Sequence, residues 1–283
     1  MTNQDEHGNL FGKWQIAPNT WCITNRWANF IYLLIGEEKA MLIDTGSAEG
    51  NLREFVETIT DKPVMVVNTH GHFDHTGGNS CWAKAWMTKE AAEYAKVPFS
   101  PMHREWFESK GYPDYQIHEL ADGDIIELGN RQVEVIAIGA HSEGSIALLD
   151  RTCRAMFTGD ELESGQVLWF VRDHALPPKE VAAIHKRNME KLLSYRKEYD
   201  WLWPAHNGVP LLPDIYLQDF ISLDEQIMEG TAKVMPNTGG FGFPSDTSQA
   251  GGPFAQYGKL ERAEYRTASV VYSLEGYEYR EKS

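Results

Sequence analysis

Six consecutive residues, His70-Gly71-His72-Phe73-Asp74-His75, bring three imidazoles and one carboxylate into a short segment. Imidazole nitrogen and carboxylate oxygen are the usual ligands of Zn²⁺, and they also suit iron or manganese in a mixed site. One catalytic ion takes only about three protein ligands. The density of ligand types in this segment therefore predicts a site for two metal ions, with chemistry on an oxygen that the metals hold.

Three further ligand types lie downstream, each just past an apolar run. His141 follows the run 133–138, Asp160 follows 156–159, and His206 follows 201–203. Loops at strand ends are where a rigid sheet can hold functional side chains. We therefore expect these three side chains to emerge at a sheet edge and to share one site with the His-rich segment.

The elements that must position these residues follow from hydrophobic periodicity. Short apolar or alternating runs predict strands at 30–35, 40–43, 64–67, 83–87, 124–128, 132–138, 145–149, 155–158, 201–203 and 264–274. Helical spacing predicts helices at 51–59, 89–96, 178–199 and 214–228. This order predicts one α/β domain over residues 1–283 with two related halves.

Two connections lack a clear period. Residues 97–121 are rich in proline and aromatic residues, and a connection of this length predicts a lid. Residues 236–258 are rich in Gly, Ser and Pro, which indicates a flexible loop or a second lid. Residues 210–283 as a whole form a predicted C-terminal extension. His185 carries no ligand spacing within its helix, and we expect it on the surface.

Composition restricts the partners. The chain has 26 Lys and Arg against 41 Asp and Glu, a formal charge of −15, which argues against nucleic-acid and anionic-membrane surfaces. No apolar run reaches the length of a membrane span, and the polar first 13 residues predict no secretory signal. The three widely spaced cysteines indicate free thiols and a cytoplasmic location. The expected partner is a small-molecule substrate, and a homodimer is compatible with the sequence.

Five segments together resemble the metallo-β-lactamase-fold hydrolases. They are LIDTG at 42–46, THGHFDHTGG at 69–78, AHSEGS at 140–145, FTGDEL at 157–162 and PAHNG at 204–208, in the order typical of that family. The resemblance spans about residues 30–208. It implies an α/β fold, a four-layer αβ/βα sandwich with the metals at one edge of the two sheets.

The resemblance also implies a role for each candidate residue. His70, His72 and His141 would hold one ion, Asp74, His75 and His206 the second, and Asp160 would bridge both. Asp44 and Thr69 would orient ligand imidazoles. The expected ions are two Zn²⁺, with iron or manganese as alternatives. Two such ions lower the pKa of a shared water to roughly 7, so a bridging hydroxide can attack a carbonyl or phosphoryl centre. Asp74 would also move a proton as a catalytic residue.

These features favour a hydrolase of small carboxylic esters, thioesters or lactones. Asp160 favours the glyoxalase-like and lactonase-like branch over antibiotic hydrolysis, and Gly139-Ala140 replaces the usual Pro-Gly before the ligand histidine. No Lys/Arg pattern for glutathione stands out after residue 210. Three alternatives stay open: a mononuclear iron persulfide dioxygenase, a phosphodiesterase of small molecules, and a metal-bound scaffold without catalysis. Arg104, Arg172 and Arg266 are candidates to bind an anionic substrate group.

Overall fold

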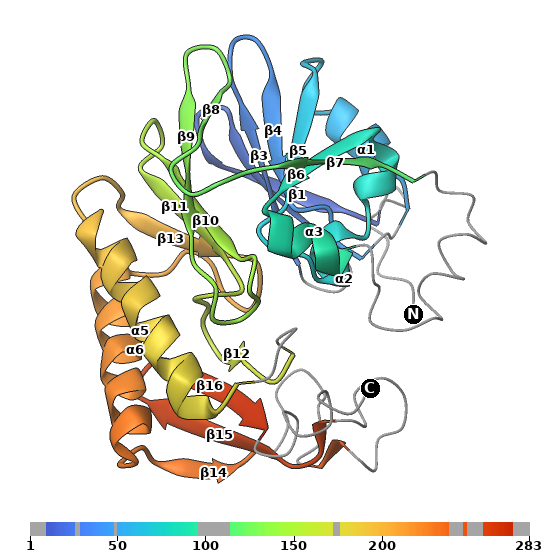
Figure 1. Cartoon of the computed structure of the whole chain (residues 1–283). Helices are drawn as coiled ribbons and strands as arrows, with labels where there is room; N and C mark the ends of the chain where they lie inside the picture. Colours follow the sequence, from blue (N-terminus) through green and yellow to red (C-terminus); the bar gives the residue numbers. More distant parts are fainter. Residues whose placement is uncertain are drawn as a thin grey trace. The chain divides into compact units, whose positions relative to one another are not determined.

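The computed structural model describes residues 10–25, 29–47, 50–95, 114–171, 176–237, 246–247 and 257–273. The chain forms two compact units. The first contains Met1–Ala137 and Ile146–Phe157, and the second contains Ile138–Ser145 and Thr158–Ser283. Figure 1 labels helices and strands of both units.

A seven-stranded sheet forms most of the first unit. Its strands lie in chain order: β1 (Gly12–Ala17), β2 (Thr20–Thr24), β3 (Phe30–Ile35), β4 (Ala40–Ile43), β5 (Val64–Val67), β6 (Lys84–Met87) and β7 (Gln116–Glu119). The first four are antiparallel neighbours, and β4 to β7 are parallel. Parallel strands need crossover connections. Helix α1 (Leu52–Glu57) lies in the first crossover, α2 (Phe73–Thr76) and a 3-10 turn at Asn79–Cys81 in the second, and α3 (Lys89–Ala95) follows β6.

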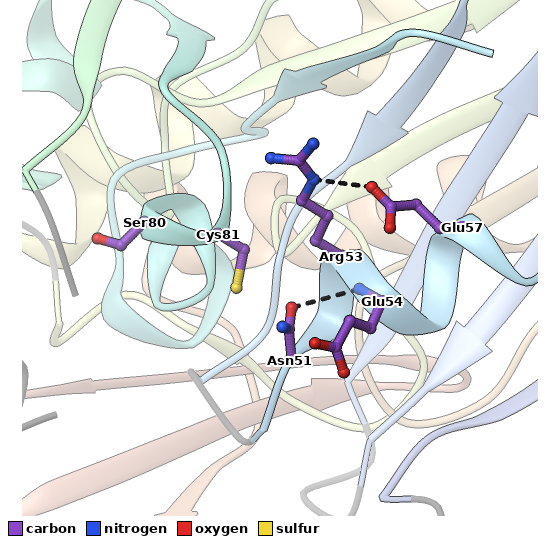
Figure 2. A pocket seen from close by; sticks show the side chains of 6 residues that line it. All are labelled: Asn51, Arg53, Glu54, Glu57, Ser80 and Cys81. Atoms are coloured by element: carbon purple, nitrogen blue, oxygen red, sulfur yellow. Dashed lines mark hydrogen bonds and ion pairs between the residues drawn. The ribbon is translucent and has the colours of Figure 1, made fainter. Parts of the chain in front are cut away.

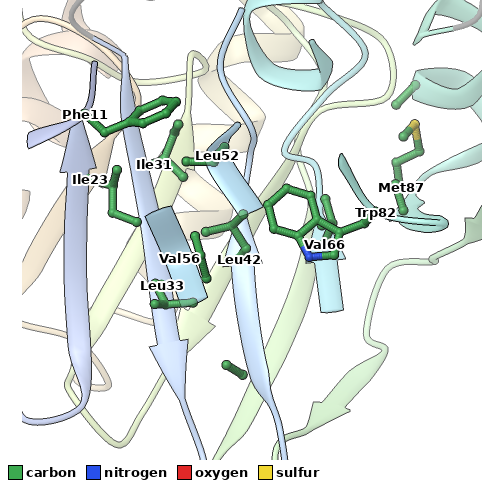
Figure 3. Close-up of a cluster of buried hydrophobic side chains, with 13 residues drawn as sticks. Phe11, Ile23, Ile31, Leu33, Leu42, Leu52, Val56, Val66, Trp82 and Met87 are labelled. Carbon is green, nitrogen blue, oxygen red and sulfur yellow. The ribbon is translucent and has the colours of Figure 1, made fainter. Parts of the chain in front are cut away.

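One face of this sheet is buried against α1. Leu33, Leu42 and Val66 project from three strands of the sheet and pack in one cluster with Leu52 and Val56 of the helix (Figure 3). All five are at most 1% exposed. Burying a side chain of this size contributes about 1.5–3 kcal/mol each. This packing makes the sheet a rigid base for the loop that follows β5.

A second sheet of the first unit contains β8 (Ile125–Glu127), β9 (Gln132–Ala137), β10 (Ile146–Asp150) and β11 (Ala155–Gly159), in the order β11-β10-β9-β8. These neighbours are antiparallel. Arg131 ties this sheet to the first one, because its guanidinium donates to Asp150 Oδ2 at 2.7 Å, to Thr20 Oγ1 at 2.7 Å and to the Asn19 carbonyl at 2.9 Å. The buried charge is thus paired and hydrogen-bonded, as burial requires.

The second unit combines a helix pair with a small mixed sheet. The sheet has the order β12-β16-β15-β14, with β12 (Val167–Leu168), β14 (Val234–Pro236), β15 (Leu260–Tyr265) and β16 (Ala268–Ser273). Helices α5 (Pro178–Ser194) and α6 (Pro213–Glu229) lie side by side, and α6 packs on β15 and β16 (Figure 1). Strand β13 (Trp201–Pro204) lies between the two helices in the chain.

Most predicted helices and strands are confirmed, and the differences are as follows. The strand predicted at 264–274 is a hairpin, because the chain turns at Arg266-Thr267 between β15 and β16. Strands β1, β2, β12 and β14 were not predicted. Of the predicted lid at 97–121, residues up to 113 lie outside the described part, and 116–119 form strand β7, which pairs with β6. Most of the predicted loop at 236–258 also lies outside it.

Two other expectations concern thiols and membranes. Cys22, Cys81 and Cys153 are all free cysteines. Burial raises the pKa of the Cys153 thiol to about 12, with the Asp150 carboxylate adding to the shift. Cys153 is therefore an unreactive thiol at neutral pH. Among the residues that the structure describes, no helix combines the length and the apolar character that a membrane crossing requires.

Candidate metal centre

The His-rich loop begins where β5 ends and runs into α2. Its path requires glycine at two places, because another backbone comes close. A Cβ atom at Gly71 would lie 2.4 Å from the Ala91 carbonyl oxygen of α3, and one at Gly78 would lie 2.5 Å from the Thr45 carbonyl oxygen. The loop is therefore pressed between α3 and the end of β4. This packing fixes its course without help from a ligand.

The structure brings the four candidate ligands of this loop together within the first unit. The ring centroid of His70 lies 4.5 Å from that of His72 and 4.0 Å from that of His75. Asp74 Oδ2 lies 3.6 Å from His75 Nε2. The three imidazoles are at most 3% exposed, whereas the Asp74 side chain is 38% exposed. Asp74 is thus the candidate ligand of this loop that solvent reaches most readily.

Asp44 holds two of these rings in one orientation. Its Oδ1 accepts the Thr69 amide at 2.8 Å, and its Oδ2 accepts the Thr69 hydroxyl at 2.8 Å and lies 2.9 Å from His75 Nδ1. The Thr69 hydroxyl, whose hydrogen goes to Asp44, lies 3.1 Å from His70 Nδ1. In this arrangement Nδ1 of both rings is the donor, so Nε2 of His70 and His75 carries the lone pair that a metal needs.

Sequence reasoning missed the polar groups behind the loop. The His75 carbonyl oxygen accepts the Thr45 amide at 2.8 Å, the Thr45 hydroxyl at 3.0 Å and the Asn68 side-chain amide at 2.8 Å. The Asn29 side chain donates to the Asp74 carbonyl oxygen at 3.1 Å. Lone Asn and Thr residues carry no spacing signal of their own. Thr45 lies within the recognised segment at 42–46 and Asn68 directly precedes the one at 69–78, which is the hint that the sequence offers.

The second unit supplies three candidate ligands from three loops. Asp160 stands at the end of β11, and its Oδ2 lies 3.6 Å from His141 Nε2 and 3.5 Å from His206 Nε2. All three residues are buried. His141 Nδ1 lies 2.8 Å from the Leu168 carbonyl oxygen. A carbonyl oxygen only accepts, so Nδ1 of His141 carries the hydrogen and Nε2 presents its lone pair toward Asp160.

The structure corrects the expectation that His185 lies on the surface. The ring is fully buried in α5, with Nδ1 2.8 Å from Asp224 Oδ2 and Nε2 2.9 Å from the Glu161 carbonyl oxygen. Burial alone lowers the pKa of this imidazole, but the Asp224 carboxylate and Glu161 together raise it to about 9. The apolar stripe of α5 gave no sign of this, because the partners lie 39 and 24 residues away in the chain.

The remaining candidates lie elsewhere or outside the described residues. Arg266 is 71% exposed at the β15–β16 turn, 3.7 Å from Asp219, while Arg104 and Arg172 fall outside the described part. A surface pocket of about 440 Å³ in the first unit contains none of the predicted ligands. It is lined by Asn51, Arg53, Glu54, Glu57, Ser80 and Cys81 (Figure 2).

The candidate donors of each unit suit borderline divalent cations. Across both units they are five imidazoles and two carboxylates, with no thiolate among them. This composition suits Zn²⁺ and, with similar geometry, Fe or Mn. For His70, His75 and His141 the Nδ1 partners described above leave Nε2 available as a ligand, which is the arrangement that metal-binding histidines usually have.

Comparisons with known proteins agree with the resemblance to the metallo-β-lactamase-fold hydrolases that the sequence motifs indicated. The family model of the metallo-beta-lactamase superfamily matches residues 24–236. The human acyl-coenzyme A thioesterase MBLAC2 is 29% identical over 170 residues, covering 49% of this chain and 60% of the relative. The hydroxyacylglutathione hydrolase of Gloeobacter violaceus is 30% identical over 139 residues, covering 48% of this chain and 50% of the relative. The matched part therefore spans about half the length of these relatives.

A solved structure extends the likeness to the fold. A beta-lactamase domain protein from Burkholderia ambifaria superposes with a TM-score of 0.59 at 19% identity, covering 77% of this chain and 76% of that one. The fold and the His- and Asp-rich clusters thus define a protein of the metallo-β-lactamase fold with side chains that could hold metal ions. The chain belongs to the metallo-β-lactamase superfamily. The predicted fold class and family are confirmed.

Proposed function

We propose that the protein is a two-metal hydrolase that cleaves a small acyl thioester. Three imidazoles would hold one ion and a mixed set of imidazoles and carboxylates the other. The donor residues divide into these two groups: His70, His72 and His141, and Asp74, His75, Asp160 and His206. The observation that carries the proposal is the position of Asp160, within 3.6 Å of His141 Nε2 and His206 Nε2, which suits a bridging carboxylate.

Zinc is the ion we propose, because histidine and carboxylate ligands with open positions are typical of catalytic zinc. When bound, two such ions act as Lewis acids and lower the pKa of a bound water to roughly 7. The Asp44 carboxylate keeps the His75 ring fixed and, through the Thr69 hydroxyl, the His70 ring.

Asp74 is the residue we propose to move protons. Its side chain is 38% exposed, and Oδ2 lies 3.6 Å from His75 Nε2, so the carboxylate is within reach of solvent and of the donor cluster at once. The Asn29 amide donates to the Asp74 carbonyl oxygen at 3.1 Å and limits its movement. A carboxylate held in this way can take a proton from the attacking water and return it to the product.

A thioester is the substrate class that the chemistry favours. The leaving thiol has an ordinary pKa of about 8.5, so it departs as a thiolate with little help from a general acid. An oxoester loses a far more basic alkoxide. The two curated relatives are, by their names, a hydrolase of acyl-coenzyme A and one of hydroxyacylglutathione, both of which are thioesters. A lactone or simple ester would then be a slower substrate of the same site.

The proposal is tested by hydrolysis assays on protein of known metal content. Purified protein would be depleted with a chelator, reloaded with zinc, and offered acyl-coenzyme A, hydroxyacylglutathione, a matched oxoester and a lactone. We expect thioester hydrolysis that disappears with the metal and returns with zinc. Zinc-loaded protein that cleaves none of the thioesters, or iron-containing protein that consumes oxygen with a thiol persulfide, would contradict it.

A further inference from the structure

A buried polar network in the second unit connects the helix pair to the backbone of two candidate ligands. Glu161 follows Asp160 directly and is fully buried. Its carboxylate accepts the Ala140 amide at 2.9 Å and the His141 amide at 2.9 Å. The Glu161 side chain thus holds the backbone of Ala140 and His141 close to the chain segment that contains Asp160 and Glu161.

Helix α5 holds Glu161 from behind at two points. The Asn188 side-chain amide donates to the Glu161 carboxylate at 2.6 Å, and the His185 ring donates from Nε2 to the Glu161 carbonyl oxygen at 2.9 Å. His185 and Asn188 stand three residues apart, so they share one face of the helix. Both the side chain and the main chain of Glu161 are therefore fixed by the same helix face.

Helix α6 completes the network through Asp224. Its carboxylate lies 2.8 Å from His185 Nδ1, and both residues are fully buried. Because the Glu161 carbonyl only accepts, His185 Nε2 must carry a hydrogen. The rings of Trp169 and Phe220 lie 5.4 and 5.2 Å from the imidazole and exclude water from it. A buried network whose members are hydrogen-bonded specifies one local structure.

We propose that Glu161 is a positioning residue for the metal centre, and that Asn188, His185 and Asp224 hold it in place. This inference rests on the proposed metal-dependent function. Glu161 touches neither metal nor substrate in this assignment. It fixes the His141 backbone relative to Asp160, so that His141 Nε2 stays 3.6 Å from the Asp160 carboxylate whether or not a metal is bound. The α5–α6 pair thereby determines the spacing of two ligands.

The test compares Glu161→Gln with Asp219→Asn. Asp219 is a matched control: it is a buried carboxylate of the same unit, and it accepts the amide and hydroxyl of Thr267 at the β15–β16 turn. Zinc affinity would be measured by competition with a chelator, the visible spectrum after cobalt substitution, and His141 amide exchange in metal-free protein. We expect Glu161→Gln to lose roughly 10–100-fold in zinc affinity, with an altered cobalt spectrum and faster exchange, and Asp219→Asn to match the wild type in all three.

Asn188→Ala provides the second variant should Glu161→Gln fail to fold, because it removes a single donor to the carboxylate. A smaller loss of zinc affinity in the same direction would support the proposal. Wild-type zinc affinity, cobalt spectrum and His141 exchange in Glu161→Gln or, failing that, in Asn188→Ala would overturn it. Wild-type protein that binds zinc but cleaves no thioester would contradict the proposed function alone. If wild-type protein took up no metal, the exchange of the His141 amide would still decide whether Glu161 fixes this backbone.

Discussion

The His-rich loop of the first unit and the ligand loops of the second unit hold their candidate donors by different means. In the first, four donors lie within six residues, and close packing of Gly71 against α3 sets the course of the loop. In the second, three donors come from positions 141, 160 and 206, and side chains of α5 and α6 hold the backbone around them. The donors of the first cluster are neighbours in the chain, although distant residues such as Asp44 and Asn29 support them, whereas the donors of the second come from distant segments.

This difference shows where each cluster is vulnerable. The first can be disturbed by a change in the loop itself, in the Asp44 carboxylate, or in the Thr45 and Asn68 side chains that donate to the His75 carbonyl oxygen. The second can be disturbed from residues that touch no ligand, such as Asn188 and Asp224.

Removing the shared carboxylate should have the largest effect. In Asp160→Ala, His141 and His206 lose a carboxylate that lies within 3.6 Å of Nε2 of both rings. We expect the zinc content to fall by at least one equivalent per chain and kcat/KM to fall by more than about 100-fold, as for loss of a metal ligand rather than of its support. Elemental analysis and thioester hydrolysis would measure this. Unchanged zinc content would remove Asp160 from the ligand set.

Replacing the carboxylate under the first cluster should have an intermediate effect. Asp44→Asn keeps the size of the side chain but weakens its contacts with Thr69 and the His75 ring. We expect zinc affinity to fall by roughly 10–100-fold, in the range known for partners of metal-binding histidines. The comparison with Glu161→Gln is direct, since both changes neutralise a buried carboxylate that touches no metal. A loss in only one variant would show that the two clusters are not supported equally.

The pH dependence of stability should report on the helix pair. The pKa of His185 is raised in the folded protein to about 9, from an ordinary value of 6.5. The folded state therefore binds the proton more tightly, and the resulting stability is fully present below pH 6.5 and is lost as the pH rises through 9.

We expect metal-free wild-type protein to lose on the order of 1–3 kcal/mol of unfolding free energy over this range from His185. Asp224→Asn should be less stable at pH 6.5 and should lose less as the pH rises, because the carboxylate facing the ring is gone. Urea unfolding at a series of pH values would measure both. Parallel curves for the two proteins would contradict a charged His185–Asp224 pair.

A change in the surface pocket should have the smallest effect. Arg53 and Glu57 form an exposed ion pair at 2.9 Å, four residues apart on α1 (Figure 2). Such pairs contribute about 0.3–0.5 kcal/mol. We expect Arg53→Ala to alter stability by no more than this, and to leave zinc affinity and hydrolysis at wild-type levels. A clear loss of hydrolysis would show that this pocket takes part in the reaction.

The sequence predicted the first cluster far better than the supports of the second. The His-rich loop could be read because its donors are neighbours in the chain and follow a clear apolar strand. His141, Asp160 and His206 were found through their place after strands and through the family resemblance. Glu161 stood beside a recognised ligand, but its partners Ala140 and Asn188 lie 21 and 27 residues away. His185 looked like a surface residue, because periodicity gives the face of a helix but not the polar partner that makes burial of a charge favourable.

The prediction of the fold was also limited, because sequence periodicity reveals apolar strands and amphipathic helices better than turns and weakly apolar strands. Strands β4, β5 and β6 and helices α1 and α3 were predicted, since each is a buried apolar run or an amphipathic stripe, whereas the parallel strand β7 fell in the predicted lid. The segment 264–274 was read as one strand, because Arg266-Thr267 is not a typical turn sequence, although Arg266 takes a left-handed φ of 52°. β1 is largely exposed, and the apolar run of β2 is limited to Trp21-Cys22-Ile23.

The most direct measurement is the metal content per chain of wild-type protein and of His141→Ala, both reloaded with zinc and freed of excess metal. If the seven donors form a two-metal site, the wild type retains close to two equivalents and the variant close to one, because the three-imidazole set has lost a ligand. A wild type that retains no zinc, or equal zinc in both proteins, would contradict the proposed site.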